Sequence, residues 1–439
     1  MRHYPDVGVL CGSMLLPKPE IVLSKWSVIA CDQFTSQPDY WKKVEDIIGE
    51  APSTYHLVLP EAFLGKKDEN KWIESIKQHA TRYLQENIFY EVDSMIFIER
   101  EFRGVRRRGL IAAIDLEQYG FEPYTSSLIR ASEETILNRL PPRVLIRQNS
   151  PIETSHTLLL IDDRTQSIIE PLSQITSKLL KLYEFELMQD SGYIRGYAIE
   201  DPKIETKIIN GFRRLINPEQ YSKMYSLEQA NQPVLFAVGD GNHSLAAAKV
   251  HWDSIKQDVG YNHPARFAMV EIINLHDPGL RIEPIHRLLS GIRAEQLIET
   301  VKSTQPNWQI GFCSTFEELA ANIQLSTPSI PLFGVFSTDH CLLISLVNQS
   351  SNHPIESIQS FLDQLMKSNP QVSIDFIHDA ESIHQLAQQP GNLGIFMPGL
   401  SKIDLYPIIL KHGVLPRKAF SMGDAREKRF YLECRKIVW

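Results

Sequence analysis

The stretch Val238-Gly-Asp-Gly-Asn-His-Ser-Leu-Ala-Ala-Ala248 decides the fold that we expect for this chain. Residues 234–238 end an apolar run of strand length, and residues 243–256 have a helical pattern that includes three consecutive alanines. Glycines at positions 239 and 241 let the backbone bend between these elements and approach a ligand closely. A strand, a glycine turn and a helix direct backbone N–H groups at an anion. The stretch therefore predicts an interior strand, followed by a helix N-terminus that binds a phosphate or a carboxylate.

The turn between this strand and this helix also carries four polar side chains, Asp240, Asn242, His243 and Ser244. Asp240 has the chemistry of a base or a metal ligand, and His243 has that of a proton donor beside the anion. A tight turn in which Asn242 only caps the helix is the simpler interpretation. The crowding of functional side chains into so short a segment favours a functional site.

The composition indicates a protein with a large core and argues against several classes. The 439 residues, 43% of them hydrophobic, are enough for two or more subdomains, and the net charge of −8 offers no basic surface for nucleic acid. The five cysteines are scattered and form no Cys-x-x-Cys pair, which argues against a disulfide framework and a structural zinc site. The sequence shows no signal-peptide pattern and no apolar run of membrane-spanning length. We therefore expect a cytoplasmic protein that binds neither nucleic acid nor membranes.

The pattern along the chain is of the mixed α/β (α+β) type, with strands joined both by helices and by hairpins. Residues 1–125 form an N-terminal α+β region that we expect to contribute to the site, and residues 126–290 form the core around the glycine turn. In residues 291–414, helices and strands alternate and titratable clusters are sparse, which indicates a smaller α/β subdomain. Residues 415–439 bring polar residues back, so we expect this C-terminal segment to return to the site and to end in a helix.

A polar loop at residues 31–38 directly follows an expected strand at residues 27–30. Functional residues are often placed in loops at strand ends. Asp32 is therefore a candidate site residue, and simple capping of the loop is the alternative.

Residues 128–147 combine a predicted helix with a cluster of guanidinium groups. Ser132 can cap a helix that begins at Glu133, and Pro141 with Pro142 would end that helix. Guanidinium groups bind phosphate or carboxylate in bidentate fashion. Those of this segment are Arg130, Arg139, Arg143 and Arg147. A solvated helix face is the alternative, although the apolar residues between the arginines indicate partial burial.

Two later segments offer further anion contacts. His286 and Arg287 stand side by side after a bend that a proline fixes. In the tail, the Ser-x-Gly turn at Ser421 follows Lys418 and would close over a phosphate. The same residues would alternatively form only the capped start of a helix.

The combined motifs resemble a known superfamily and, more narrowly, one family. The strand, the turn Asp240-Gly-Asn-His243 and the helix resemble the signature of the ParB/sulfiredoxin-like superfamily. The upstream Ser132-Glu-Glu-Thr135 and the tail Leu415-Pro-Arg-Lys-Ala-Phe-Ser-Met-Gly423 resemble a bacterial family of formerly unknown function that is similar to pyrophosphate-dependent free L-serine kinases. This likeness extends over nearly the whole chain. It implies a ParB/sulfiredoxin-like catalytic core with an N-terminal extension and a smaller C-terminal α/β subdomain.

The resemblance also implies an activity and a set of site residues. The chain would phosphorylate free L-serine to O-phosphoserine, with pyrophosphate as the donor and Mg²⁺ bound at Asp240. Glu133 would take the proton of the serine hydroxyl, and His243 would stabilise the transferred group. The residues assigned to the donor phosphates are Gly239, Gly241, Asn242, Ser244, Arg130, Arg139, Arg143, His286, Arg287, Lys418 and Ser421. Those assigned to the acceptor are Asp32, Gln33 and Thr135.

One departure from the superfamily pattern affects the donor site. Ser244 stands where the superfamily usually has arginine, so another cation must meet the phosphates. We expect Arg130, Arg139 and Arg143 to converge with His243 in one pocket for this purpose. The chain also lacks the Gly-x-x-x-x-Gly-Lys-Ser/Thr motif of nucleotide-binding loops, which fits pyrophosphate as the donor.

Other functions stay open at this point. An ATP- or ADP-dependent serine kinase would use the same acceptor with a nucleotide donor. A ParB-like nucleotide- or nucleic-acid-binding regulatory protein would need a basic face and a recognition helix, and the charge argues against both. A small-molecule-binding regulator would retain the site without turnover. No pattern in the sequence indicates an oligomeric state.

Overall fold

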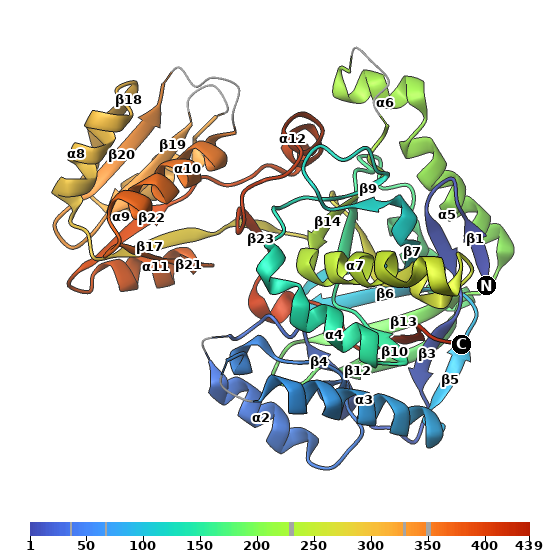
Figure 1. Cartoon of the computed structure of the whole chain (residues 1–439). Coiled ribbons are helices and arrows are strands. Elements are labelled where there is room, and N and C mark those ends of the chain that lie inside the picture. The colour runs from blue at the N-terminus through green and yellow to red at the C-terminus, as the bar shows by residue number, and fades with distance from the viewer. Residues whose placement is uncertain (36, 66–67, 228–231, 328–330, 348–352) are drawn as a thin grey trace. The chain divides into compact units, whose positions relative to one another are not determined.

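The computed structural model describes residues 1–35, 37–65, 68–227, 232–327, 331–347 and 353–439 (Figure 1). The chain forms two compact units. The first comprises Met1–Leu280 together with Ala425–Trp439, and the second comprises Arg281–Asp424. Each unit has its own sheets and its own core, so each is described by itself.

The first unit is built on a mixed sheet that has eleven strands within the described residues. Its main path runs in the spatial order β12 (Leu180–Glu186), β13 (Tyr193–Ile199), β6 (Met95–Phe102), β7 (Val105–Asp115), β15 (Phe267–Asn274), β11 (Leu158–Ile161), β14 (Phe236–Asp240), β9 (Ile129–Ala131) and β8 (Tyr119–Gly120). Beside β7 it is extended by β2 (Val9–Cys11) and β1 (Arg2–Tyr4). The division expected at residue 125 therefore does not separate two structural units, because strands from both sides of it form one sheet.

Both faces of the central part of this sheet are buried, because its strands carry two alternating sets of apolar side chains. On β6, Met95 and Phe97 belong to one hydrophobic cluster, whereas Ile96 and Ile98 belong to another. Helices contribute to both clusters and so cover both faces. Those of the Ile96 cluster are α2 (Pro38–Ile48) and α3 (Glu69–Gln85), and those of the Met95 cluster are α5 (Pro202–Leu215) and α7 (Asn242–Val259).

Short strands tie the end of the chain into the first unit. β25 (Cys434–Lys436) lies between β10 (Ile152–Thr154) and β3 (Met14–Pro17), and β3 also pairs with β5 (Phe89–Val92). β24 (Phe430–Tyr431) pairs with β4 (Val28–Ile29). The helix expected at the end of the chain is therefore wrong. In residues 429–435 the charged residues and Tyr431 occupy the odd positions, and Phe430, Leu432 and Cys434 lie between them; that period of two belongs to a strand.

The strand, turn and helix around which the sequence is organised are present. β14 is an interior strand that pairs with β11 in antiparallel fashion and with β9 in parallel fashion. It ends at Asp240, slightly later than expected, and α7 begins at Asn242 rather than at His243. The prediction of an interior strand followed by a helix is confirmed.

The helix expected from Glu133 is wrong. The chain is non-helical after β9 and makes a single 3-10 turn at Leu137–Arg139 before α4 (Pro141–Asn149). Pro141 and Pro142 therefore begin a helix rather than end one, because proline has no N–H to lose in the first turn. The remaining helices of the first unit are α1 (Leu23–Trp26) and α6 (Pro218–Tyr225).

The second unit contains a six-stranded sheet within the described residues. Its spatial order is β18 (Trp308–Phe312), β20 (Cys341–Leu346), β19 (Leu332–Phe336), β22 (Asn392–Phe396), β17 (His286–Ser290) and β21 (Ser373–Ile377). Its helices are α8 (Ala294–Thr304), α9 (Phe316–Gln324), α10 (Pro354–Ser368), α11 (Ala380–Ala387) and α12 (Leu405–His412). The unit is longer at both ends than the expected 291–414, because the paired strands β16 (Ile282–Pro284) and β23 (Phe420–Met422) belong to it.

Candidate functional site

The glycine turn at the end of β14 is fixed by a close approach between backbones. Gly241 has a φ of +79°, in the left-handed region that favours glycine, and it caps the N-terminus of α7. A Cβ atom at this position would lie 2.9 Å from both the Cα and the Oγ1 atoms of Thr157. Position 241 therefore requires glycine for its backbone angle and for its space.

Asp240, the last residue of β14, has two partners. Its Oδ1 atom accepts a hydrogen bond from the Gly241 N–H at 2.8 Å. Its Oδ2 atom lies 3.1 Å from the Nζ atom of Lys428, whose side chain is only 6% exposed. Lys428 comes from the C-terminal segment and was not among the predicted site residues. A carboxylate and an ammonium group thus stand together at the N-terminus of α7.

The non-helical segment after β9 is held against this turn at two points. The Ser132 hydroxyl donates to the Val238 carbonyl oxygen, and the Ile136 N–H donates to His243 Nε2 at 3.1 Å. Glu133 lies between these two anchors and is half-buried. Since Nε2 accepts, a neutral His243 carries its proton on Nδ1. Proton donation by His243 in this arrangement would therefore have to use Nδ1.

A cavity of about 120 Å³ lies beside the start of α7. One wall is formed by α7 and α4, which pack side by side (Figure 1), and includes Ser244 and Arg143. The lining is mainly apolar: Ile146, Ala247 and Ala248 come from these two helices, and Leu57, Val58, Leu59 and Ile152 come from other segments. The cavity is thus a pocket next to the predicted anion site.

A chain of polar contacts connects this cavity to the loop of Asp32. The Tyr431 hydroxyl lies 2.7 Å from His156 Nδ1 and donates to Cys31 Sγ at 3.1 Å. His156 Nε2 lies 3.9 Å from Asp32 Oδ2, and the Gln33 side-chain amide donates to Asp32 Oδ1 at 2.9 Å. Burial raises the pKa of the Cys31 thiol to about 11, so it stays protonated at neutral pH.

The predicted convergence of three arginines with His243 is wrong. Arg143 lines the cavity, where it pairs with Glu61 and donates to the Arg139 carbonyl oxygen at 2.5 Å. Arg139 is exposed. Arg130 donates to the carbonyl oxygens of Ser127 and Gln232, both at 3.0 Å. These carbonyls precede β9 and β14, so the guanidinium group lies at the opposite end of the strands from the turn.

His286 and Arg287 are parts of the sheet of the second unit rather than exposed anion contacts. His286 is 2% exposed, and its Nδ1 atom accepts from the Met397 N–H at 3.1 Å. Burial lowers the pKa of His286 to about 3, so the ring is neutral. Arg287 is fully buried and donates from Nε to Gln359 Oε1 at 3.1 Å. Both residues lie on β17, an interior strand, which explains their burial.

Lys418 and Ser421 also belong to the second unit. Lys418 is exposed and has a φ of +57°. Ser421 is 4% exposed, lies on β23 and donates to the Gly423 carbonyl oxygen at 3.2 Å. Their assignment to the donor phosphates stays a prediction.

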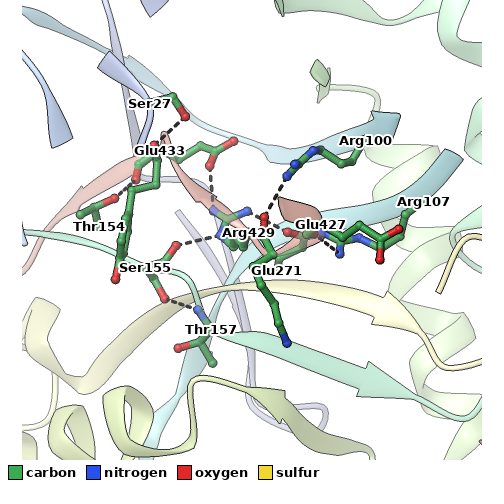
Figure 2. Close-up of polar contacts among 12 residues, drawn as sticks. Ser27, Arg100, Arg107, Thr154, Ser155, Thr157, Glu271, Glu427, Arg429 and Glu433 are labelled. Atoms are coloured by element: carbon green, nitrogen blue, oxygen red, sulfur yellow. Dashed lines mark hydrogen bonds and ion pairs between the residues drawn. The ribbon is translucent and has the colours of Figure 1, made fainter. Parts of the chain in front are cut away.

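Buried charges from the C-terminal segment cross the centre of the first unit (Figure 2). Arg429 donates to the Ser155 carbonyl oxygen at 2.7 Å and pairs with Glu271 at 3.0 Å and Glu433 at 2.8 Å. Burial opposes the charge of Arg429, but the two carboxylates outweigh it and raise its pKa. Arg107 also pairs with Glu271, at 3.3 Å. This network fixes the backbone on which Lys428 stands.

Magnesium was expected at Asp240, and the donor set around it is small. Among the described residues, no group of three or more His, Cys, Asp or Glu side chains is placed to hold a metal ion. Asp240 therefore fits Mg²⁺ only as a single protein ligand, with phosphate oxygens and water as the other ligands.

The chain belongs to a family of proteins of unknown function, DUF1015, whose model matches residues 14–387. This match covers the glycine turn and the cavity wall on α4. No curated protein matches the chain. In the part of the chain that the structure describes, no helix is both long and apolar enough to cross a membrane.

Several solved structures resemble the chain at low identity. A conserved hypothetical protein from Pyrococcus furiosus is 9% identical, with 75% of this chain and 95% of that chain covered and a TM-score of 0.39. A free serine kinase in complex with AMP is 9% identical, with 74% and 92% covered and a TM-score of 0.40. SbnI from Staphylococcus aureus, truncated at its C-terminus, is 10% identical, with 71% and 82% covered and a TM-score of 0.37. Likeness at this level does not carry an activity from one protein to another.

Proposed function

We propose that the protein is a phosphotransferase that moves a phosphoryl group to the hydroxyl of free L-serine. The observation that carries the proposal is the turn at Gly241, where Asp240 and the N-terminus of α7 meet the anchored segment of Glu133. A helix N-terminus favours an anion, and a carboxylate close to that anion can activate a hydroxyl group. This combination fits phosphoryl transfer better than binding alone.

The donor binds at the turn, and pyrophosphate is the donor that we propose. Its phosphate oxygens would meet the N–H groups of the first turn of α7. His243 would stabilise the transferred group through its Nδ1–H, because its Nε2 atom accepts from the Ile136 N–H. A nucleotide such as ATP or ADP presents the same phosphate chemistry and is the alternative donor.

The acceptor binds on the side of the cavity. A free amino acid carries an ammonium and a carboxylate group, and each needs an opposite charge. Asp32, which is half-buried beside His156, would bind the ammonium group. Arg143 lines the cavity and would bind the carboxylate group by sharing its guanidinium with Glu61. Gln33 and Thr135 complete the proposed acceptor site.

The transfer itself is a displacement at phosphorus. The serine hydroxyl oxygen forms a bond to the phosphorus atom, and the bond from that phosphorus to the bridging oxygen of the donor breaks. The hydroxyl proton passes to the carboxylate of Glu133, and phosphate leaves when the donor is pyrophosphate. Mg²⁺ bound with the donor would neutralise charge on its phosphates, with Asp240 as the protein ligand.

Phosphorus NMR of the purified protein tests this function. Separate samples contain L-serine and Mg²⁺ with pyrophosphate, ATP or ADP. The proposal expects the O-phosphoserine resonance to grow in at least one sample, most strongly with pyrophosphate. The absence of a phosphoester resonance with all three donors would contradict it.

A further inference from the structure

Lys428 pairs with Asp240 at the turn where the sequence motif lacks its usual arginine. Position 244 carries serine where a cation was expected, and the ammonium group of Lys428 stands at the same turn, 3.1 Å from Asp240. We propose that Lys428 is the cation that binds the phosphates of the donor at the N-terminus of α7. This inference rests on the proposed function in one respect, namely that the ligand of the turn carries phosphate.

Three guanidinium groups that are candidates for this role have other partners. Arg130 is held at the far end of β9 and β14 by two carbonyl oxygens. Arg143 is paired with Glu61. Arg429 is buried and paired with the Ser155 carbonyl oxygen and two carboxylates. Lys428 is the cation in the described part of the first unit that is paired directly with the turn.

The ammonium group of Lys428 retains hydrogen-bonding capacity. It has three N–H donors, and among the described residues its side chain contacts Asp240. The side chain is 6% exposed, so an unused donor there is costly unless a ligand meets it. A phosphate oxygen can take the remaining donors while Asp240 keeps its own contact. A lysine in this role acts as a point charge for phosphate.

The backbone that carries Lys428 is anchored on both sides. The guanidinium of Arg100 donates to the Lys428 carbonyl oxygen at 2.9 Å and to the Arg426 carbonyl oxygen at 2.6 Å. Arg107 donates to the Glu427 carbonyl oxygen at 3.1 Å. These buried donors hold the segment in place before a ligand arrives. Such preorganisation reduces the entropy lost on binding and suits a residue that positions phosphate.

Two buried polar atoms near the turn independently indicate that a ligand belongs there. Asn242, the first residue of α7, is 9% exposed, and its Oδ1 atom has no hydrogen-bond partner among the described residues. The Thr135 hydroxyl, next to the Ile136 that bonds His243, has none either within the described chain. Native proteins rarely leave such atoms unsatisfied. A rotated Asn242 amide can donate to a phosphate oxygen, and the Thr135 hydroxyl can donate to the acceptor bound beside it.

Binding of inorganic pyrophosphate, measured by titration calorimetry with and without MgCl₂, tests the inference without any need for turnover. Lys428→Met removes the charge and keeps the length, so we expect affinity for pyrophosphate to fall at least tenfold. Lys428→Arg should retain most of the affinity. Lys436→Met is the matched control, because that lysine lies in the same segment but is 48% exposed and pairs with Glu91 at 3.4 Å. A folded Lys428→Met protein that binds pyrophosphate like the wild type would overturn the inference.

A second variant covers the case in which Lys428→Met does not fold. Asp240→Asn leaves the ammonium group in place and removes the carboxylate that competes for it. Without Mg²⁺, pyrophosphate should then bind as tightly as to the wild type, or more tightly. A loss of metal-free binding in Asp240→Asn would overturn the inference.

The outcomes also separate this inference from the proposed function. Pyrophosphate binding that depends on Lys428, without phosphorylation of L-serine, would support the inference and contradict the function. Phosphorylation of L-serine at the wild-type rate by Lys428→Met would support the function and overturn the inference. A wild-type protein that binds neither pyrophosphate nor ATP would also overturn it.

Discussion

Gly241 lies so close to Thr157 that a Cβ atom at position 241 would be 2.9 Å from the Thr157 Cα atom. Gly241→Ala should therefore lower the free energy of unfolding by more than the strain of a left-handed backbone angle alone. The left-handed angle costs about 1–2 kcal/mol for a residue with a side chain, and the forced shift of Thr157 adds about 1–3 kcal/mol. Urea unfolding measures the sum.

Gly104→Ala is the matched control for this prediction. Gly104 has a similar φ of +77°, but a Cβ there meets nothing within 4 Å. Gly104→Ala should lose only the part of the free energy of unfolding that the backbone angle costs, and it should leave pyrophosphate binding unchanged. Equal losses of stability in both variants would mean that the contact with Thr157 does not constrain the turn.

Glu133→Gln should abolish most of the turnover. The substitution keeps the size of the side chain and removes the base, so kcat should fall by a factor of about 10² to 10⁴. Pyrophosphate binding should be retained. Glu134 follows Glu133 in a non-helical segment and is exposed, so Glu134→Gln should change kcat only slightly. Steady-state kinetics on both variants, with Asp32→Asn beside them, decides which carboxylate takes the proton.

Arg429→Met should strongly destabilise the first unit. Removing one partner of a buried ion network leaves Glu271 and Glu433 short of a counter-charge, which typically costs about 3–5 kcal/mol. Lys436→Met, in the same segment but half-exposed, should change the free energy of unfolding by less than about 0.5 kcal/mol. Urea unfolding of both variants checks this, and similar values for the two would refute the structural role of the network.

His286 should make the stability of the second unit depend on pH. Its pKa is lowered from 6.5 to about 3 by burial, so below pH 6.5 the unfolded chain takes up a proton that the folded chain does not. The free energy of unfolding should therefore fall as the pH drops from about 6.5 towards 3, by up to about 1.4 kcal/mol per pH unit from this group.

His286→Asn removes this contribution and keeps an acceptor for the Met397 N–H. His353 has a pKa that burial lowers to about 4, so the wild type and the variant must be compared at each pH. Unfolding free energies at pH 7 and pH 5 should differ less in His286→Asn than in the wild type. An equal difference in both proteins would show that His286 does not carry the effect.

The sequence predicted the strand, turn and helix because each signal there is local. An apolar run, two glycines and an alanine-rich stretch specify their own backbone, and β14 with α7 follows from them. The segment at Glu133 was mispredicted because the pair Pro141-Pro142 is equally suited to start a helix. Local patterns do not distinguish these two uses of proline.

The residues that surround the turn could be predicted only in part, because the pairing of strands brings them together from distant parts of the sequence. Lys428 and Thr157 reach Asp240 and Gly241 from distant segments, and no spacing in the sequence relates them. One signal was present: Arg429, Glu433 and Arg435 all fall on odd positions, with the apolar Phe430, Leu432 and Cys434 on even ones, as in a strand whose charged face is buried. That pattern predicts a buried ion network, although not its partners.

The most direct test of the account uses L-serine labelled with ¹⁸O in its hydroxyl group. Wild-type protein is incubated with this substrate, Mg²⁺ and pyrophosphate, and the product is followed by phosphorus NMR. The account predicts O-phosphoserine whose resonance shows the isotope shift of a bridging ¹⁸O, because the serine oxygen attacks phosphorus, and it predicts little product with Glu133→Gln. Release of phosphate without any labelled phosphoester, from pyrophosphate and equally from ATP or ADP, would contradict it.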